Sequence, residues 1–172
     1  MEVAEAATVA TATYKHNFPD ATVKTSRLEN IKPKVLRDQI GDIDLLLASP
    51  ECTNHTCAKG SAPRSEESRA TAMQTIRFAK TFQPRWIVLE NVIHMRPWSR
   101  YGELLDALRD MGYNLKEFIL DASEFGVGQK RRRLFIVADR EDEPADIVAP
   151  RTKKAPTIKK LLDKTGTWKT TP

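Results

Sequence analysis

The stretch Trp86-Ile87-Val88-Leu89-Glu90-Asn91 decides the fold of this 172-residue chain. Four apolar residues follow one another without a break, and a carboxylate and an amide come directly after them. A short continuous apolar run is typical of a buried strand in a parallel sheet. Open α/β sheets bind their ligands at the carboxyl ends of such strands. Glu90 and Asn91 are therefore the first candidate site residues.

The segments on both sides of this strand alternate between β-rich runs and helical patterns. Strands are predicted at 21–24, 43–48, 86–89, 114–120 and 133–138, and helices at 7–17, 34–39, 65–82 and 101–111. This alternation predicts an α/β fold, with a largely parallel sheet and flanking helices. The strand at 43–48 is expected to be buried, and Gly112 is expected to close the last helix in a left-handed conformation.

The glycines argue against a complete nucleotide-binding domain. Such a domain normally opens with a glycine-rich turn that lets a helix N-terminus approach the ligand. No G-x-G-x-x-G can be assembled from the seven glycines, and the only G-x-G, at Gly126 and Gly128, is followed by basic residues. If the chain uses a nucleotide-like cofactor, this turn is missing from it.

The basic charge of the chain belongs to its C-terminal part. The chain has 28 basic and 23 acidic residues, a net charge of +5, but residues 151–172 alone hold seven Lys/Arg against the single Asp163. Because 139–156 is charged and interrupted by prolines, the domain edge is expected there. The tail could neutralise phosphates, or it could be a solvated linker.

Cysteine use and hydropathy favour a soluble, cytoplasmic protein. Cys52 and Cys57 lie too close in one loop for a disulfide framework. No apolar run approaches the roughly 20 residues that span a bilayer, and no signal peptide is visible at the N-terminus. We therefore expect no contact with a membrane.

The polar loop after the strand at 43–48 is the second candidate site. Cys52 follows a strand-to-loop junction, where a thiol can face a cleft and be activated as a thiolate by a nearby positive group. An inert loop thiol is the alternative. A zinc site of Cys52, His55 and Cys57 is less favoured, because the three lie within six residues and no second ligand pair follows, so we expect no metal.

The third candidate is the basic run Gln129-Lys130-Arg131-Arg132-Arg133, at the entry to an apolar strand. Side chains alternate between the two faces of a strand, so Gln129, Arg131 and Arg133 should share one face. The alternative is a surface charge run. Glu90 has its own alternatives: it could hold or donate a proton to a ring nitrogen, or it could be a capping or solvent-facing residue.

In this order the three motifs resemble those of the cytosine-C5 DNA methyltransferases, over roughly residues 2–140. Pro50-x-Cys52 resembles the Pro-Cys nucleophile loop of the family, Glu90-Asn91-Val92 its Glu-Asn-Val motif, and Gln129-x-Arg131-x-Arg133 its Gln-x-Arg-x-Arg motif. Tyr14 to Pro19 is similar to the segment that follows the carboxylate for the cofactor ribose, which gives that role to Glu5.

The resemblance implies a reaction and a role for each motif. Cys52 would add to C6 of a flipped-out cytosine, Glu90 would hold N3 and the amine, and Arg131 and Arg133 would brace the base or the loop. The methyl group would come from S-adenosylmethionine, with Glu5 and Pro50 on the cofactor side. Asn91 and Gln129 would contact the substrate. DNA is the implied partner, in DNA methylation of the restriction-modification kind.

The chain also departs from the family pattern. Glu51 stands where the family has a second proline, Arg27 aligns near the place of an adenine-binding Asp, and the glycine-rich cofactor loop and the target-recognition domain have no counterpart. We therefore expect an incomplete Rossmann-like methyltransferase domain at 1–140, followed at 141–172 by a basic linker and the start of a recognition region. A partner chain could supply the missing parts. A tRNA cytosine methyltransferase, or an inactive or split remnant that binds nucleic acid, remain alternatives.

Overall fold

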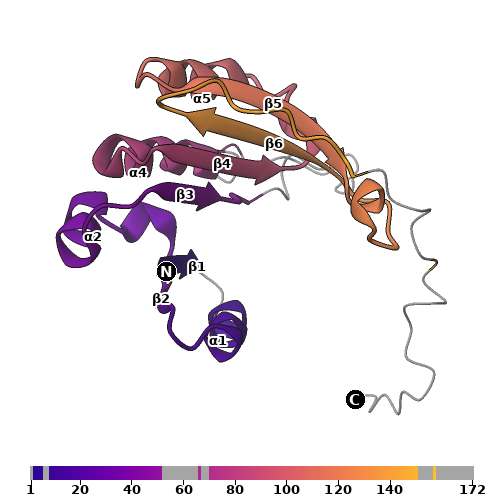
Figure 1. The fold of residues 1–172 in the computed structure, drawn as a ribbon. Helices are drawn as coiled ribbons and strands as arrows, with labels where there is room; N and C mark the ends of the chain where they lie inside the picture. Colours follow the sequence, from indigo (N-terminus) through magenta and orange to yellow (C-terminus); the bar gives the residue numbers. More distant parts are fainter. Residues whose placement is uncertain (1, 6–7, 52–65, 67–69, 151–156, 158–172) are drawn as a thin grey trace, which may run out of the picture.

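The computed structural model describes residues 2–5, 8–51, 66, 70–150 and 157, which form two sheets with helices beside them (Figure 1). Strands β1 (Glu2–Glu5) and β2 (Thr22–Thr25) pair in parallel as a two-stranded sheet. The second sheet has the order β3-β4-β6-β5. Its strands are β3 (Leu45–Ala48), β4 (Trp86–Asn91), β5 (Asn114–Asp121) and β6 (Arg132–Asp139).

The predicted α/β fold with flanking helices is confirmed, but the four-stranded sheet is mixed rather than largely parallel. β3 and β4 are parallel, whereas β6 is antiparallel to both β4 and β5. A parallel crossover needs a dozen or more residues and usually a helix. Only ten residues join β5 to β6, and their regular structure is a single 3-10 turn, η5 (Ala122–Phe125). The chain can therefore return only as an antiparallel neighbour.

The helices lie close to their predicted positions, with one exception. They are α1 (Thr8–Asn17), α2 (Pro33–Ile40), α4 (Gln74–Phe82) and α5 (Tyr101–Arg109), with the 3-10 turns η1 (Leu28–Asn30), η3 (Ala70–Met73) and η4 (Ile93–Met95). Gly112 has the predicted positive φ, at 85°. The exception is the helix predicted over 65–82, which is α-helical at Glu66 and from Gln74 to Phe82 but 3-10 at η3 between them; no feature of the sequence explains this tighter turn.

One face of the four-stranded sheet packs against α4 and α5. The side chains of alternate residues on β4 and β6 are almost fully buried there: Ile87, Leu89, Leu134, Ile136 and Ala138. Ala72, Ile76 and Ala79 of the predicted apolar stripe supply the opposite side of this core, whereas Phe82, which is also buried, packs in a second cluster with Ile31, Leu36 and Phe78. Burial of an apolar side chain of this size contributes roughly 1.5–3 kcal/mol, so this layer holds β4 in place.

The other face of the sheet is more open at β3. Leu45 and Leu47 are 45% and 69% exposed, whereas the alternate residues Leu46 and Ala48 pack on the core. The prediction that the strand at 43–48 is buried is therefore wrong for one of its two faces. The sequence alone does not show which face of this strand is exposed. When all four residues are apolar, a strand buried on one face has the same pattern as a strand buried on both faces.

Contacts of Arg85 and Trp86 hold the start of β4 against the end of β6. The guanidinium of Arg85 lies 4.4 Å over the ring of Trp86, and Trp86 Nε1 donates to Asp139 Oδ2 at 2.8 Å. Arg85 also pairs with Glu141 at 2.6 Å and with Asp142 at 3.0 Å. Because Trp86 and Asp139 are partners in the β4–β6 ladder, these contacts support the register of that pair.

Candidate functional site

The carboxyl ends of β3 and β4 lie side by side, and side chains continue the contact where the backbone ladder ends. The last ladder pair is Ala48 with Leu89. Beyond it, Ser49 Oγ donates to Glu90 Oε2 at 2.6 Å, and Asn91 Nδ2 donates to the carbonyl oxygen of Pro50 at 3.2 Å. Two successive residues of β4 thus hold the two residues that lead into the cysteine loop.

Arg133 holds the second oxygen of the Glu90 carboxylate. Its Nε lies 3.0 Å from Glu90 Oε1, and the two side chains are 23% and 28% exposed. Glu90 pairs with Phe135 in the antiparallel ladder, so Arg133, two residues earlier on β6, is its diagonal neighbour on the same face. With one donor on each oxygen, the orientation of the carboxylate is fixed while part of it still faces solvent.

Asn91 faces the opposite way, into the core, and has a different role. The residue is 1% exposed, and its Oδ1 accepts a hydrogen bond from the backbone N–H of Val92 at 2.8 Å. Its amide therefore satisfies a backbone donor and the buried carbonyl of Pro50 at once. Asn91 is thus a structural support for the start of the loop, and its side chain points away from the face that carries Glu90.

The basic motif is split by the beginning of β6. Because the strand starts at Arg132, the prediction that Gln129, Arg131 and Arg133 share one strand face is wrong for the first two. Gln129 and Arg131 lie in the exposed segment before the strand. There the backbone N–H of Arg131 donates to Asp121 Oδ1 at 3.1 Å. Of these three motif residues, Arg133 alone lies on the strand, and it is the one that contacts Glu90.

The remaining predicted residues lie apart or outside the described residues. Glu5 is the last residue of β1 and pairs in register with Thr25 of β2, so it belongs to the smaller sheet. Cys52 lies outside the described residues, as do His55 and Cys57 of the zinc alternative. Within the parts of the chain that are described, no three His, Cys, Asp or Glu residues cluster as a metal site.

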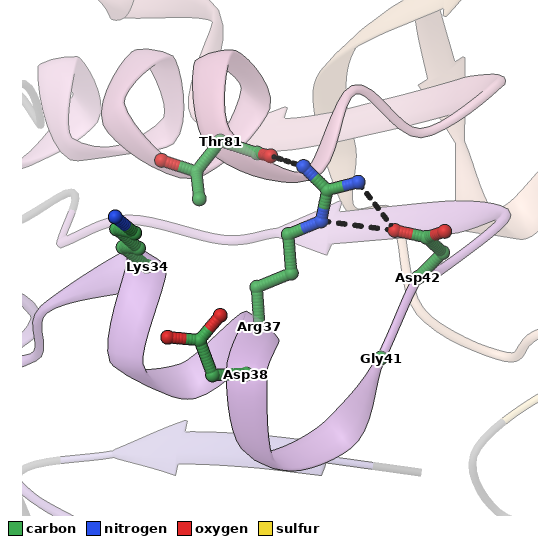
Figure 2. Close-up of a pocket in the computed structure, with 6 residues that line it drawn as sticks. All are labelled: Lys34, Arg37, Asp38, Gly41, Asp42 and Thr81. Atoms are coloured by element: carbon green, nitrogen blue, oxygen red, sulfur yellow. Dashed lines mark hydrogen bonds and ion pairs between the residues drawn. The ribbon is translucent and has the colours of Figure 1, made fainter.

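A hollow of about 500 Å³ lies away from this site, at the end of α2 (Figure 2). Arg37 reaches across it. Its Nε and Nη2 donate to Asp42 Oδ1 at 2.9 and 2.6 Å, and its Nη1 donates to the carbonyl oxygen of Thr81 at 2.8 Å. These bonds tie α2 to the end of α4, so we assign the hollow a structural role.

A second hollow, of about 530 Å³, lies between α1 and β2. Four threonines line it together with Ala12, Lys15 and Val23, and the hydroxyls of Thr11 and Thr25 are joined by a hydrogen bond of 3.0 Å. Lys15 Nζ donates to the carbonyls of Pro19 and Ala21 at 2.6 and 2.8 Å. Because Thr25 is the ladder partner of Glu5, this hollow lies in the part of the fold predicted to meet the cofactor.

Ser49 is the site residue that the sequence pattern did not reveal. A serine after an apolar strand is common in loops, so its type alone carries no signal. The useful information is the register: because Ala48 pairs with Leu89, the next residues on the two strands are Ser49 and Glu90. A parallel pairing of these strands, assumed from the sequence, would have brought the two together.

Solved structures of other proteins share the fold of this chain. One is Dnmt2 methyltransferase of S. pombe (TM-score 0.72, 22% identity, 96% of this chain and 52% of that one). Another is a mutant of DNMT2 of Spodoptera frugiperda (TM-score 0.72, 20% identity, 96% and 52%).

A family model identifies the class to which the chain belongs. The model of the C-5 cytosine-specific DNA methylases matches residues 3–171, and the chain belongs to that family. It is 30% identical over 150 residues to the type II methyltransferase M.AgeI of Thalassovita gelatinovora, covering 83% of this chain and 35% of that protein. It is 28% identical to a tRNA (cytosine(38)-C(5))-methyltransferase of Rattus norvegicus, covering 85% and 37%. The chain thus spans about a third of the length of the curated relatives it matches.

In its described parts, no helix has the length and apolar character needed to cross a membrane.

Proposed function

We propose that this chain carries the base-chemistry half of a DNA cytosine-C5 methyltransferase, with Cys52 as nucleophile and Glu90 as the group that holds the cytosine ring. The observation that carries the proposal is the Glu90 carboxylate at the end of β4, which Ser49 and Arg133 fix beside the end of β3, the strand that precedes Cys52. The family match over residues 3–171 supports it.

The reaction needs a fixed carboxylate because cytosine C5 is a poor nucleophile. When the Cys52 thiolate adds to C6, negative charge develops on the ring, and a group that donates a proton to N3 and accepts from the exocyclic amine lowers the barrier. A group that already has its working orientation needs no reorganisation when charge develops on the substrate. Ser49 and Arg133 give Glu90 such an orientation, so the carboxylate need not be reoriented during the addition.

Each bond formed in this sequence is matched by a bond broken. The S–C6 bond would form as N3 gains a proton from the Glu90 carboxyl, and C5 would then take the methyl group, with the sulfur of the methyl donor as the leaving group. Loss of the C5 proton to a base would expel the Cys52 thiolate, and return of the N3 proton to Glu90 would restore the ring. C6 of a stacked base cannot be reached by a thiol, so the cytosine must leave the duplex first.

S-adenosylmethionine would supply the electrophilic methyl group, and the residues present fit only part of it. Glu5 stands at the carboxyl end of a parallel strand, where a carboxylate can accept hydrogen bonds from ribose hydroxyls. Pro50, buried beside Asn91, is the other predicted cofactor-side residue. The 172 residues contain no glycine-rich turn, so the rest of the cofactor has no counterpart here.

The experiment is a covalent-trapping assay. The protein is incubated with S-adenosylmethionine and duplex DNA containing 5-fluorocytosine, in which the C5 substituent cannot leave as a proton, so that the adduct persists. We expect a DNA-linked species that Cys52→Ser abolishes and Cys57→Ser, the matched control in the same loop, retains. An adduct that survives Cys52→Ser would remove the role given to that residue.

Two alternatives have their own supporting observations. The similarity to tRNA (cytosine(38)-C(5))-methyltransferases supports a tRNA substrate, and the assay repeated with 5-fluorocytosine tRNA separates the two. The basic residues of 151–172 are the observation behind the second alternative, an inactive or split remnant that binds nucleic acid without turnover. That alternative expects salt-dependent DNA binding through the basic residues of 151–172 and no heat of binding for S-adenosylmethionine.

A further inference from the structure

The connection between β5 and β6, the orange turn at the right of Figure 1, is closed by one carboxylate oxygen. Asp121 is the last residue of β5, and its Oδ1 accepts from the backbone N–H of Ser123 at 3.0 Å and from the Ser123 hydroxyl at 2.8 Å. The same oxygen accepts from the backbone N–H of Arg131 at 3.1 Å, at the other end of the connection. Asp121 thus joins the two ends of this turn.

The backbone of Arg131 is held on both of its sides. Its N–H donates to Asp121, and its carbonyl accepts from the backbone N–H of Ala122 at 3.1 Å. Inside the turn, the backbone N–H of Val127 donates to the carbonyl of Ala122 at 3.2 Å, and Gly126 has the positive φ, 87°, that the end of η5 requires. Both polar backbone groups of Arg131 are therefore used within the connection.

The side chain of Arg131, in contrast, makes no hydrogen bond or ion pair in the parts of the chain that the structure describes. The residue is exposed, whereas Arg133, two residues later, lies 3.0 Å from Glu90. A guanidinium that no protein group uses keeps its charge and its five donors for an acceptor from outside. Of the two arginines, Arg133 therefore holds a protein carboxylate, and Arg131 is available to a ligand.

We propose that Asp121 is a positioning residue for the nucleic-acid substrate: it fixes the backbone of Arg131 and so holds the guanidinium in the place where the substrate binds. This role rests on the proposed function, which supplies the nucleic acid that Arg131 would contact. The donors of Ser123, and after them the N–H of Arg131 and the charge of Lys130, hold the pKa of Asp121 below its usual range. The carboxylate is therefore ionised at neutral pH, and a charged oxygen is the stronger acceptor.

Charge alone predicts the opposite effect of removing this carboxylate. Asp121 lies close enough to Lys130 to feel its charge, and loss of an acid beside basic residues should strengthen binding to a polyanion. If Asp121 positions Arg131, its removal should weaken binding instead, because the backbone of Arg131 loses one of its two fixed points. The direction of the change in affinity therefore distinguishes positioning from simple electrostatics.

The experiment is a double-mutant cycle on the full 172-residue protein, read from its affinity for duplex DNA at one fixed salt concentration. The duplex carries a cytosine opposite adenine, because a mismatched base leaves the stack at low cost. We expect Arg131→Ala and Asp121→Ala each to weaken binding by about fivefold, and the double variant to bind no more weakly than Arg131→Ala. Losses that fail to add in this way show that Asp121 acts through Arg131.

Two conservative variants separate the position of the oxygen from its charge. Asp121→Asn keeps an oxygen in place for the N–H groups of Ser123 and Arg131 and should recover most of the affinity. Asp121→Glu keeps the charge but displaces the oxygen by one methylene group, so it should bind as weakly as Asp121→Ala. Because Asp121→Glu is still acidic, it also carries the test if Asp121→Ala fails to fold.

Amide exchange measures the fixed backbone without DNA. We expect the N–H of Arg131 to exchange at least about tenfold faster in Asp121→Ala and Asp121→Glu than in the parent, while global stability in urea stays nearly the same. The matched control is Asp106→Ala, which removes an exposed carboxylate of α5. This variant should change neither the exchange at Arg131 nor the affinity for DNA by more than about twofold.

Four results would overturn the proposal. They are fast exchange at Arg131 in the parent, undiminished binding in both Asp121→Ala and Asp121→Glu, losses that add in the double variant, and no binding of the duplex by the parent. None of these measurements requires a covalent adduct. A failed trapping assay with an intact coupling of Asp121 to Arg131 would remove the proposed chemistry alone, and additive losses with a successful trapping assay would remove the role of Asp121 alone.

Discussion

Ser49 and Glu90 meet one residue beyond the end of the β3–β4 ladder, where the serine hydroxyl donates to the carboxylate at 2.6 Å. The contact joins the residue that opens the cysteine loop to the proposed ring-holding group. A change at the end of either strand would therefore alter both the position of Glu90 and the start of the loop that contains Cys52.

Glu90→Gln should abolish most of the chemistry and leave the fold intact. The amide keeps the size of the side chain but cannot deliver a proton to N3, so we expect the rate of adduct formation to fall by about 10²–10⁴-fold. Loss of the half-exposed pair with Arg133 should cost no more than about 1 kcal/mol of unfolding free energy. Trapping rates and urea denaturation measure the two effects, and an unchanged trapping rate would contradict the role of Glu90.

Ser49→Ala and Ser49→Thr form a matched pair. Alanine removes the donor to Glu90 Oε2, whereas threonine keeps a hydroxyl at the same position. We expect adduct formation to slow by roughly tenfold with alanine and to recover with threonine, because a hydrogen bond to a charged group contributes about 1.5–3 kcal/mol and this one is partly exposed to solvent. Equal rates for both variants would show that the hydroxyl does not position Glu90.

Asn91→Leu should destabilise the protein although the new side chain has a similar volume. The substitution leaves the buried carbonyl of Pro50 without its donor and the N–H of Val92 without its acceptor. Each buried group left unpaired costs about 1–3 kcal/mol. Urea denaturation should show a loss of about 2–6 kcal/mol for Asn91→Leu, because two groups lose their partners. A loss below 0.5 kcal/mol, roughly the effect of an ordinary surface substitution, would contradict this account.

Asp139 should make the stability of the protein depend on pH in the acid range. The backbone N–H of Glu141 donates to this carboxylate, and with Trp86 and Arg85 it holds the pKa of Asp139 below its usual range. Because the pKa is lower in the folded state, the stabilisation is present above the unfolded pKa of about 3.9 and is lost as the pH falls through the folded pKa.

The variant Asp139→Asn isolates this contribution. The difference in unfolding free energy between the parent and Asp139→Asn should be constant from pH 5 to 7 and should shrink below about pH 4. Denaturation curves at several pH values measure it. A difference that stays constant through the acid range would mean that the charge of Asp139 contributes nothing.

The parts of the fold that depend on local pattern could be predicted from the sequence. The apolar run at Trp86–Leu89 and the stripe from Ala72 to Phe82 lie where the periodicity places them, because burial of one face produces that periodicity. The family was also correctly identified, from three short motifs in order.

The parts that depend on pairing could not be predicted in the same way. The direction of β6 follows from the connection at 122–131, which is too short for the helical crossover that a parallel neighbour needs. The common face of Gln129, Arg131 and Arg133 failed because the strand begins at Arg132. Asp121 instead accepts from the backbone N–H of Arg131 just before that point. Contacts between distant segments decide such boundaries.

Two arginines contact opposite ends of β4, so the number of residues between these contacts cannot change without breaking one of them. Arg85 joins the Trp86–Asp139 end, and Arg133 joins Glu90 at the other. Neighbouring side chains point to opposite faces, so removing one residue between these anchors would turn the amide of Asn91 outward and bury a carboxylate. A substitution in the middle of β4 changes only the packing. An insertion or deletion there would move Glu90 to the buried face and Asn91 to the face that now carries the carboxylate.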